Sequence, residues 1–447
     1  MKFTVYAFGS FRLDTTRRLL ITGSRICSLP DRPFRILMLL LESNGALVGR
    51  DALIDALWPG EDIGENSLTQ HIYLLRNLLA ELGGKRSYIK TESRHGYRFT
   101  LPVAVIDNSA EHLNPDVAAA VGNLIARDRF DTFRAYCEGC YLLEKRTRES
   151  LLGAVSRFDE VVQNDPLHWQ AYFGAARAYA FLGSYLYAPS TEVFPKAKVA
   201  ARRALEIRPS GAAHALLSEI TMFGEWDWAG AAAEMRTALE LEPESAFVHN
   251  AAAWLAIGQG DFDRALYEAR AALELEPASL FYRNVLARVL IHRSDYAGAV
   301  SLLSRVLELD PTIDVAVENL AFAYTANGEP ERATRILLDR AERGTLADHM
   351  TGQLARAYGD SGDGRQAERI YRELQASAEK RYVAAWPMAL AATGLGRDRE
   401  ALEQLSRGAR EREAALVFLQ RLTLFDGLRD DPEYRRIAAA VGPPAAT

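Results

Sequence analysis

Hydrophobic and polar positions divide the chain into a short part with strand-like alternation and a long helical part. Residues 1–29 alternate apolar and polar residues in short pieces separated by turn residues, which predicts a small antiparallel meander. A helix is expected to start at Asp31 or Arg32 and to stop at Asn44-Gly45, because proline at position 33 is tolerated in a first helical turn. A second, short helix is predicted from about Arg50 to Leu57.

The clearest helical period follows at residues 66–83. Five apolar residues recur at steps of four and three, so they share one face of a helix: Leu68, Ile72, Leu75, Leu79 and Leu82. Asn66 or Ser67 is expected to cap its start. The opposite face and its flank offer amides, a hydroxyl, a phenol and an arginine. Two short strands that meet at Arg94-His95-Gly96 come next.

This order of strands, three helices and a closing hairpin predicts an α+β winged helix-turn-helix domain over residues 1–102. The stretch from Leu29 to Phe99 resembles the DNA-binding domain of OmpR/PhoB-type transcription factors. The resemblance rests on the leading strands, the SLTQHIYLLR helix and the YIKTESRHGYRF hairpin, or wing. It implies that the third helix contacts bases in the major groove and that the wing contacts the minor groove or the backbone.

The resemblance also places individual contacts. Arg76 matches a phosphate-contacting arginine of the family and Arg94 matches the wing arginine, whereas Thr69, Gln70 and Tyr73 match base and backbone contacts. The full set of candidate DNA-binding residues is Arg50, Asn66, Ser67, Thr69, Gln70, Tyr73, Leu74, Arg76, Asn77, Arg94, His95 and Arg98. Leu74 departs from the family, in which many members place arginine there. We therefore expect a shifted site preference, with contact to a thymine methyl group.

A 34-residue period governs the second part of the chain. Prolines at 209, 243, 277 and 311 each follow a similar run, such as RTALELEP and RAALELEP, and a small residue lies twelve positions before each proline. The spacing resembles the tetratricopeptide repeat, a helix-turn-helix unit. An all-α solenoid of about eight repeats with a polar C-terminal cap is predicted for residues 131–447. Residues 103–130 are expected to form a linker with a short helix from Pro115 to Arg127.

Charge separates the same two parts. The chain has a net charge of −6, but residues 1–102 carry 14 Lys+Arg against 10 Asp+Glu, and the remainder is acidic. A basic small domain beside an acidic large one fits nucleic-acid contact confined to the first part. With no signal segment, no apolar run of spanning length and three cysteines, the sequence predicts a cytoplasmic protein without membrane contact.

Candidate enzymatic motifs have simpler explanations. Cys137 and Cys140 form a CxxC without a second ligand pair, so packing inside a helix is favoured over a metal site. Glycine-rich segments at 360–364 and 394–396 lack the lysine of a phosphate loop and fit inter-helix turns. No cofactor, metal or catalytic site is predicted, and the chain is not expected to be an enzyme.

The whole arrangement resembles HilA-like regulators and soluble relatives of CadC. It implies a sequence-specific regulator of transcription, expected to be an activator, that binds double-stranded promoter DNA. RNA polymerase would contact the loop from Trp58 to Asn66, and the repeats would bind a protein or peptide, form a homodimer, or both. The alternative is a repeat-based adaptor whose winged domain binds protein, which Leu74 and the small basic excess favour.

Overall fold

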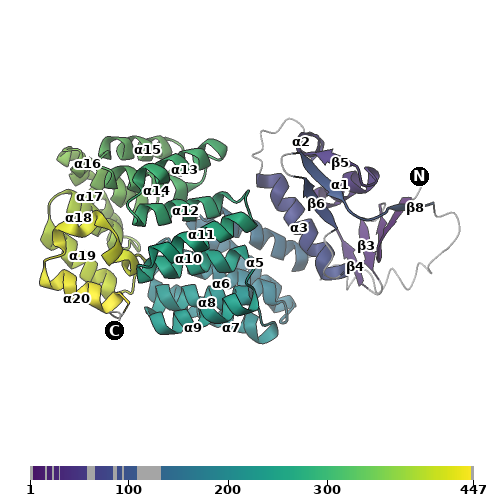
Figure 1. Ribbon diagram of the computed structural model, residues 1–447, viewed down its shortest axis with the longest axis horizontal. Coiled ribbons are helices and arrows are strands. Elements are labelled where there is room, and N and C mark those ends of the chain that lie inside the picture. Colours follow the sequence, from purple (N-terminus) through teal and green to yellow (C-terminus); the bar gives the residue numbers. More distant parts are fainter. Residues whose placement is uncertain are drawn as a thin grey trace. The chain divides into compact units, whose positions relative to one another are not determined.

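The computed structural model describes residues 4–15, 18–22, 25–29, 31–57, 66–83, 88–92, 95–107 and 132–443 (Figure 1). The chain forms two compact units. The first comprises Met1–Tyr141 with Glu160–Pro166, and the second comprises Leu142–Asp159 with Leu167–Thr447. The predicted domain boundaries at 102/103 and 130/131 stay predictions, because residues 108–131 and the short helix predicted there lie outside the described part.

The first unit contains a five-stranded antiparallel sheet in the order β4-β3-β2-β1-β8. The predicted meander corresponds to β1 (Thr4–Phe8), β2 (Phe11–Asp14), β3 (Leu19–Thr22) and β4 (Arg25–Ser28). The fifth strand, β8 (Ala104–Asp107), pairs with β1 and places Ile106 opposite Val5. The stretch predicted as a linker from residue 103 therefore begins with a strand. Its partner lies about a hundred residues away in sequence, so no local turn residues indicate the pairing.

Three helices and a second small sheet complete the winged fold. The predicted helices correspond to α1 (Asp31–Glu42), α2 (Arg50–Leu57) and α3 (Asn66–Gly83). The wing is the hairpin of β6 (Ile89–Glu92) and β7 (Gly96–Phe99), and β5 (Leu47–Gly49) adds to it in the order β5-β7-β6. The three residues of β5 were not expected as a strand, because so short a segment has no recognisable alternation.

One hydrophobic core joins the sheets and helices of this unit. Leu68, Ile72, Leu75 and Leu79 are all buried on α3, as their period predicts. They share the core with α1 residues such as Leu37 and with aromatic side chains of the strands. Phe8 of β1 and Phe99 of β7 meet edge to face with centroids 5.1 Å apart, a favoured geometry for aromatic pairs. The core thus holds α3 and the wing against one scaffold.

The second unit is helical, with consecutive helices packed in pairs. The helix over residues 132–145 belongs to the first unit up to Tyr141 and to the second from Leu142, whose side chain lies beside Gly153 of α5 (Arg148–Asn164). The following pairs are α6 (Trp169–Ser184) with α7 (Ser190–Ile207), α8 (Gly211–Ile220) with α9 (Trp228–Leu241), α10 (Ala246–Gln259) with α11 (Phe262–Leu275), α12 (Leu280–His292) with α13 (Tyr296–Leu309), α14 (Asp314–Ala326) with α15 (Pro330–Glu342), α16 (Asp348–Asp360) with α17 (Gly364–Ala378), and α18 (Ala385–Gly394) with α19 (Asp398–Arg410).

The 34-residue period explains the packing of these pairs. The recurring small residues Ala197, Ala231, Ala265 and Ala299 are completely buried where the helices of a pair cross. Prolines 209, 243, 277 and 311 each lie just after the end of a second helix. Both glycine-rich segments fall at inter-helix turns, where Gly362 and Gly396 adopt positive φ angles. Among the described residues, no helix combines the length and apolar character needed to cross a bilayer.

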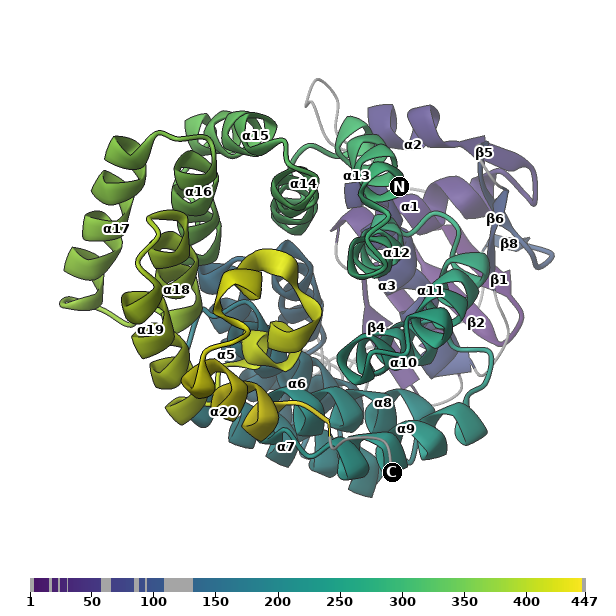
Figure 2. The same cartoon turned by 60° about the vertical axis from the view of Figure 1, so that its left-hand side comes forward.

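The C-terminal segment does more than cover the last repeat. It consists of η2 (Ala414–Arg421), η3 (Thr423–Leu428) and α20 (Pro432–Val441). While α20 packs on α19, η2 reaches α10 and η1 (Thr221–Glu225), the π-helical continuation of α8. The segment lies inside the curve of the repeat helices (Figure 2). The concave side of the solenoid is thus partly filled by the chain itself.

Candidate nucleic-acid interface

Helix α3 has a buried side and an exposed side. Its leucine and isoleucine stripe lies in the core, whereas Thr69 is exposed and the Tyr73 side chain is 56% exposed. An exposed phenol on a helix anchored by four buried aliphatic residues is available to a partner surface. The structure therefore presents two of the predicted contact residues, Thr69 and Tyr73, on the outer face of α3.

The second helix of the motif supports this face. Arg50, at the start of α2, donates from Nη2 to Thr69 Oγ1 over 3.3 Å. This contact connects the start of α2 with the first turns of α3. Both residues are predicted DNA contacts, and the fold brings them together although they lie 19 residues apart in the chain.

The wing is a tight hairpin that requires glycine at position 96. Gly96 has φ +145°, and a Cβ atom there would lie 2.0 Å from the carbonyl oxygen of Val48 on β5. The backbone N–H of His95 donates to the carbonyl of Glu92 over 2.9 Å and closes the turn. His95 is exposed at this turn. The strand β5, though short, therefore fixes the wing through a close backbone contact.

Two cations face outward on the wing. Lys90 on β6 is the direct cross-strand partner of Arg98 on β7, and their side chains are 64% and 46% exposed. Glu92 lies near both, with Oε1 3.3 Å from Lys90 Nζ and 3.7 Å from Arg98 Nε. Lys90 is not among the DNA-binding residues predicted from the sequence. Because alternate residues of a strand share a face, pairing of 89–92 with 96–99 would have placed Lys90 beside Arg98.

Arg76 connects the helix to the wing. Its Nε donates to the carbonyl of Ile89 over 2.9 Å and its Nη2 donates to Thr91 Oγ1 over 2.6 Å. The guanidinium lies 5.9 Å from the centre of the Tyr97 ring. Burial lowers the pKa of Arg76, and Tyr97 opposes that shift. Arg76 therefore has a structural task in addition to the phosphate contact that the family resemblance implies.

Several predicted contact residues cannot be placed in this surface. Asn66, Ser67, Gln70, Leu74 and Asn77 belong to α3, but their side chains lie outside the described residues. Arg94 and the loop over 58–65 lie outside them altogether. Their assignments stay predictions. Among the described residues, no group of three or more His, Cys, Asp or Glu side chains could hold a metal ion.

Comparison with known proteins identifies the first unit. Residues 24–99 match the family model described as transcriptional regulatory protein, C terminal. The N-terminal unit carries a regulatory domain of the OmpR/PhoB type. A relative of this domain is the transcriptional regulator HilA of Salmonella typhimurium, which is 34% identical over 105 residues, or 24% of this chain. The match spans only 19% of HilA.

Two solved structures resemble parts of the chain. The DNA-binding domain of E. coli CadC matches 24% of this chain and 100% of its own length, at 24% identity and a TM-score of 0.22. A human IFIT1 dimer with m7Gppp-AAAA covers 84% of this chain and 77% of its own, at 15% identity and a TM-score of 0.50, a likeness of fold alone. Residues 290–345 match a tetratricopeptide-repeat model. The OmpR/PhoB-type domain is therefore followed by a tetratricopeptide-repeat solenoid.

Proposed function

We propose that the protein is a sequence-specific DNA-binding regulator of transcription. The observation that carries this proposal is that the domain exposes Thr69 and Tyr73 on α3 and the Lys90–Arg98 pair on the wing. This face belongs to the domain that matches the transcriptional-regulator model. A helix of this kind fits the major groove, which distinguishes all four base pairs, and wing cations fit the phosphate backbone.

The wing and helix α3 would make different contributions to DNA binding. Lys90 and Arg98 would neutralise phosphates and release counterions, which supplies affinity without sequence information. Thr69, Tyr73 and the predicted Gln70, Leu74 and Asn77 would face the bases and supply specificity. Arg76 would hold the helix and wing at a fixed separation, so that both meet one duplex.

Activation of transcription is the expected direction of control. We infer from the family resemblance that the segment from Trp58 to Asn66, between α2 and α3, would contact RNA polymerase. A regulator of chromosomal promoters would work in the cytoplasm. The repeat solenoid would respond to a protein or small effector, or mediate self-association, because solenoids present extended concave surfaces. A peptide entering that surface would have to share it with the C-terminal segment.

Genome-wide occupancy of the tagged protein tests the proposal. Discrete sites sharing one sequence motif are expected for the natural protein. Arg98→Ala should weaken occupancy at all of them because it removes a phosphate contact. Uniform or absent occupancy of the natural protein, at normal expression, would refute sequence-specific binding.

One observation favours a second candidate, an adaptor whose winged domain binds protein. Glu92 lies between the wing cations, and a carboxylate there would oppose a phosphate. Salt separates the two functions in gel-shift titrations. A DNA-binding protein with several phosphate contacts loses roughly a decade or more of affinity between about 50 and 200 mM salt, whereas an adaptor would show no saturable DNA complex at either concentration.

A further inference from the structure

A cavity of about 160 Å³ opens on the concave side of the repeat solenoid. Helices of several repeats and the C-terminal segment line it together. Several aromatic side chains line the wall, among them Phe181, Phe223, Phe247, Trp254, Phe281 and Phe418. Phe418 of η2 lies 5.7 Å from Trp254 and 5.8 Å from Phe223, centroid to centroid. The C-terminal segment therefore closes one side of the cavity with an aromatic side chain.

Polar groups in the wall lack partners. Asn250 of α10 is 3% exposed, and its Oδ1 makes no hydrogen bond to any described residue. The corresponding asparagine of the next repeat, Asn284, does accept one, from Asn319 Nδ2 over 3.0 Å. A buried polar atom without a partner destabilises the fold. A ligand donor group that reaches Asn250 would remove that cost.

Arg288 of α12 supplies a buried guanidinium to the same wall, 5.2 Å from the centre of the Phe322 ring and 5.9 Å from that of Phe418. Its Nη1 donates to Asn319 Oδ1 over 2.7 Å, and its Nε has no hydrogen-bond partner within the described part of the chain. No described carboxylate forms a salt bridge with it. Burial lowers the pKa of Arg288, and the carboxylate of Glu318 opposes that shift. Burial and Arg288 together lower the pKa of the adjacent His292 to about 3, so His292 adds no positive charge at neutral pH.

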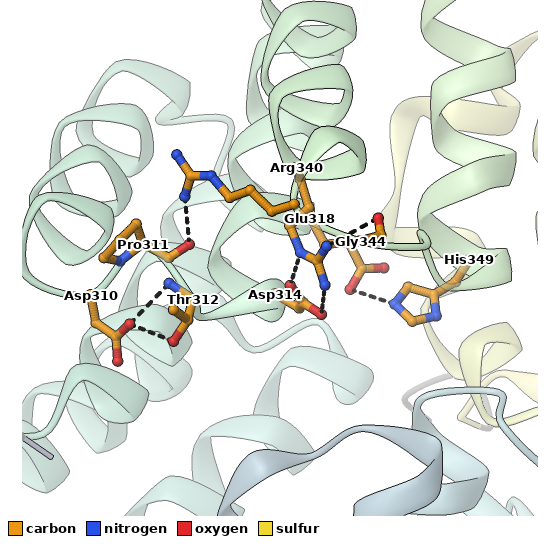
Figure 3. A network of polar contacts seen from close by, with 9 residues as sticks. Asp310, Pro311, Thr312, Asp314, Glu318, Arg340, Gly344 and His349 are labelled. Atoms are coloured by element: carbon orange, nitrogen blue, oxygen red, sulfur yellow. Dashed lines mark hydrogen bonds and ion pairs between the residues drawn. The ribbon is translucent and has the colours of Figure 1, made fainter. Parts of the chain in front are cut away.

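The nearest acidic side chain of this wall is engaged elsewhere. Glu318 of α14 lies 3.6 Å from His349 Nε2, and both residues line the cavity. Figure 3 places this pair beside Arg340, which binds Asp314 with two guanidinium nitrogens. Glu318 thus contacts His349 of α16 and forms no salt bridge with Arg288, although its charge still acts on the guanidinium. Glu219 also lines the cavity, and burial raises its pKa to about 7, against the effect of Arg177 and Arg146, so its carboxyl keeps a proton to a higher pH than an exposed glutamate does.

We propose that this cavity binds a small aromatic carboxylate, with the carboxylate on Arg288, a hydroxyl or amino donor on Asn250, and the ring against the aromatic wall. Its size limits the ligand to about one substituted ring, because an engineered cavity of roughly 150 Å³ in another protein binds benzene. Guanidinium recognises carboxylate through charge-assisted hydrogen bonds. The ligand can bind whether or not the protein recognises DNA. A role of the ligand as a regulatory signal rests on the function proposed above.

Calorimetric titration of the full chain with four probes tests the ligand class. Benzoate and 4-hydroxybenzoate should bind with dissociation constants below about 1 mM, the hydroxylated compound more tightly. Benzamide, which keeps the ring and loses the charge, should bind at least tenfold more weakly, as should acetate, which keeps the charge and loses the ring. Failure of both aromatic carboxylates to bind, or equal binding of benzamide, would overturn the proposal.

Variants then test the site. Arg288→Met should weaken 4-hydroxybenzoate at least tenfold, whereas Arg305→Met, at an exposed arginine of α13, should leave it unchanged. If Arg288→Met does not fold, Asn250→Ala provides the second measurement, because it should abolish the preference for the hydroxylated probe. Unchanged binding by these variants would place the ligand elsewhere. A separate gel shift with and without the probe shows whether binding alters DNA affinity, so loss of DNA binding and loss of ligand binding are distinguished.

Discussion

At the scale of single residues, Arg76 and Arg98 have different tasks although both were assigned to DNA contact. Arg98 is exposed, and its Nε lies 3.7 Å from Glu92 Oε1. Arg76 makes two hydrogen bonds to β6. We expect Arg98→Ala to lower DNA affinity and to reduce the slope of log affinity against log salt by about one, with no change in thermal stability. Gel shifts at several salt concentrations measure both.

Arg76→Ala should have two effects instead of one. Loss of both hydrogen bonds should destabilise the winged domain by about 1–3 kcal/mol, since a typical hydrogen bond contributes about 1 kcal/mol. DNA affinity should fall as well, because the helix and wing lose their fixed spacing. Arg12→Ala, at an exposed arginine of β2, is the matched control. A stable Arg76→Ala domain with full affinity would contradict both roles.

Glu92 is the third informative residue of the wing. Its carboxylate lies within 4 Å of two cations that are proposed to meet phosphates. An exposed pair of this kind stabilises the fold by at most about 1 kcal/mol, so Glu92→Gln should leave stability nearly unchanged. It should raise DNA affinity several-fold at low salt by removing repulsion from the backbone. Asp51→Asn, at an exposed acidic residue of α2, is the control. Weaker DNA binding by Glu92→Gln would instead favour a contact made by Glu92 itself.

At the scale of elements, the wing depends on one backbone position. Gly96→Ala puts a Cβ atom 2.0 Å from the Val48 carbonyl and forces an unfavourable φ. We expect it to destabilise the winged domain by more than about 2 kcal/mol and to abolish DNA binding. Gly45→Ala also meets a positive φ, but its nearest atom would be 3.7 Å away, so it should cost only about 1 kcal/mol. Equal melting temperatures for the two variants would contradict this.

The sequence predicts those elements whose residues interact with near neighbours in the chain, and it misses those whose partners are far away in the chain. The buried leucines of α3 and the crossing alanines of the repeats follow from local periods, and both are confirmed in the core. Strands β5 and β8 depend on partners about 50 and 100 residues away, which no local pattern specifies. Lys90 was missed because its importance comes from its cross-strand neighbour Arg98.

Part of the wall of the inner cavity could be predicted from the repeat period. The period puts the residue eleven positions after each of the prolines 166, 209, 243, 277 and 311 at the equivalent place of successive first helices: Arg177, Ile220, Trp254, Arg288 and Phe322. Three of these five line the cavity. The position of Phe418 could not be predicted from the sequence, because it depends on η2 packing against η1 and α10.

At the scale of the whole molecule, two buried carboxyl groups connect the stability of the repeat solenoid to pH. Burial raises the pKa of Glu219 to about 7. Burial likewise raises the pKa of Glu413 to about 7, although the backbone N–H groups of Ala385 and Trp386, which donate to its carboxylate, oppose the shift. Both groups hold their protons to a higher pH in the folded state than in the unfolded state, where the ordinary value is 4.5.

The sign of the effect follows from this difference. The stability that the protonated carboxyls of Glu219 and Glu413 contribute is fully present below about pH 4.5. It declines as the pH rises toward 7 and is lost above the folded pKa of about 7. Because one pKa unit corresponds to about 1.4 kcal/mol, Glu219→Gln should reduce the loss of stability between pH 5 and pH 8 by at most about 3 kcal/mol. Tryptophan fluorescence during thermal or urea unfolding measures it, since five of the six tryptophans lie in the solenoid. Glu274→Gln, at an exposed residue of α11, should keep the natural pH dependence. If Glu219→Gln kept it too, Glu219 would be ionised in the folded protein at neutral pH, and a bound carboxylate would then meet a negative charge opposite Arg288.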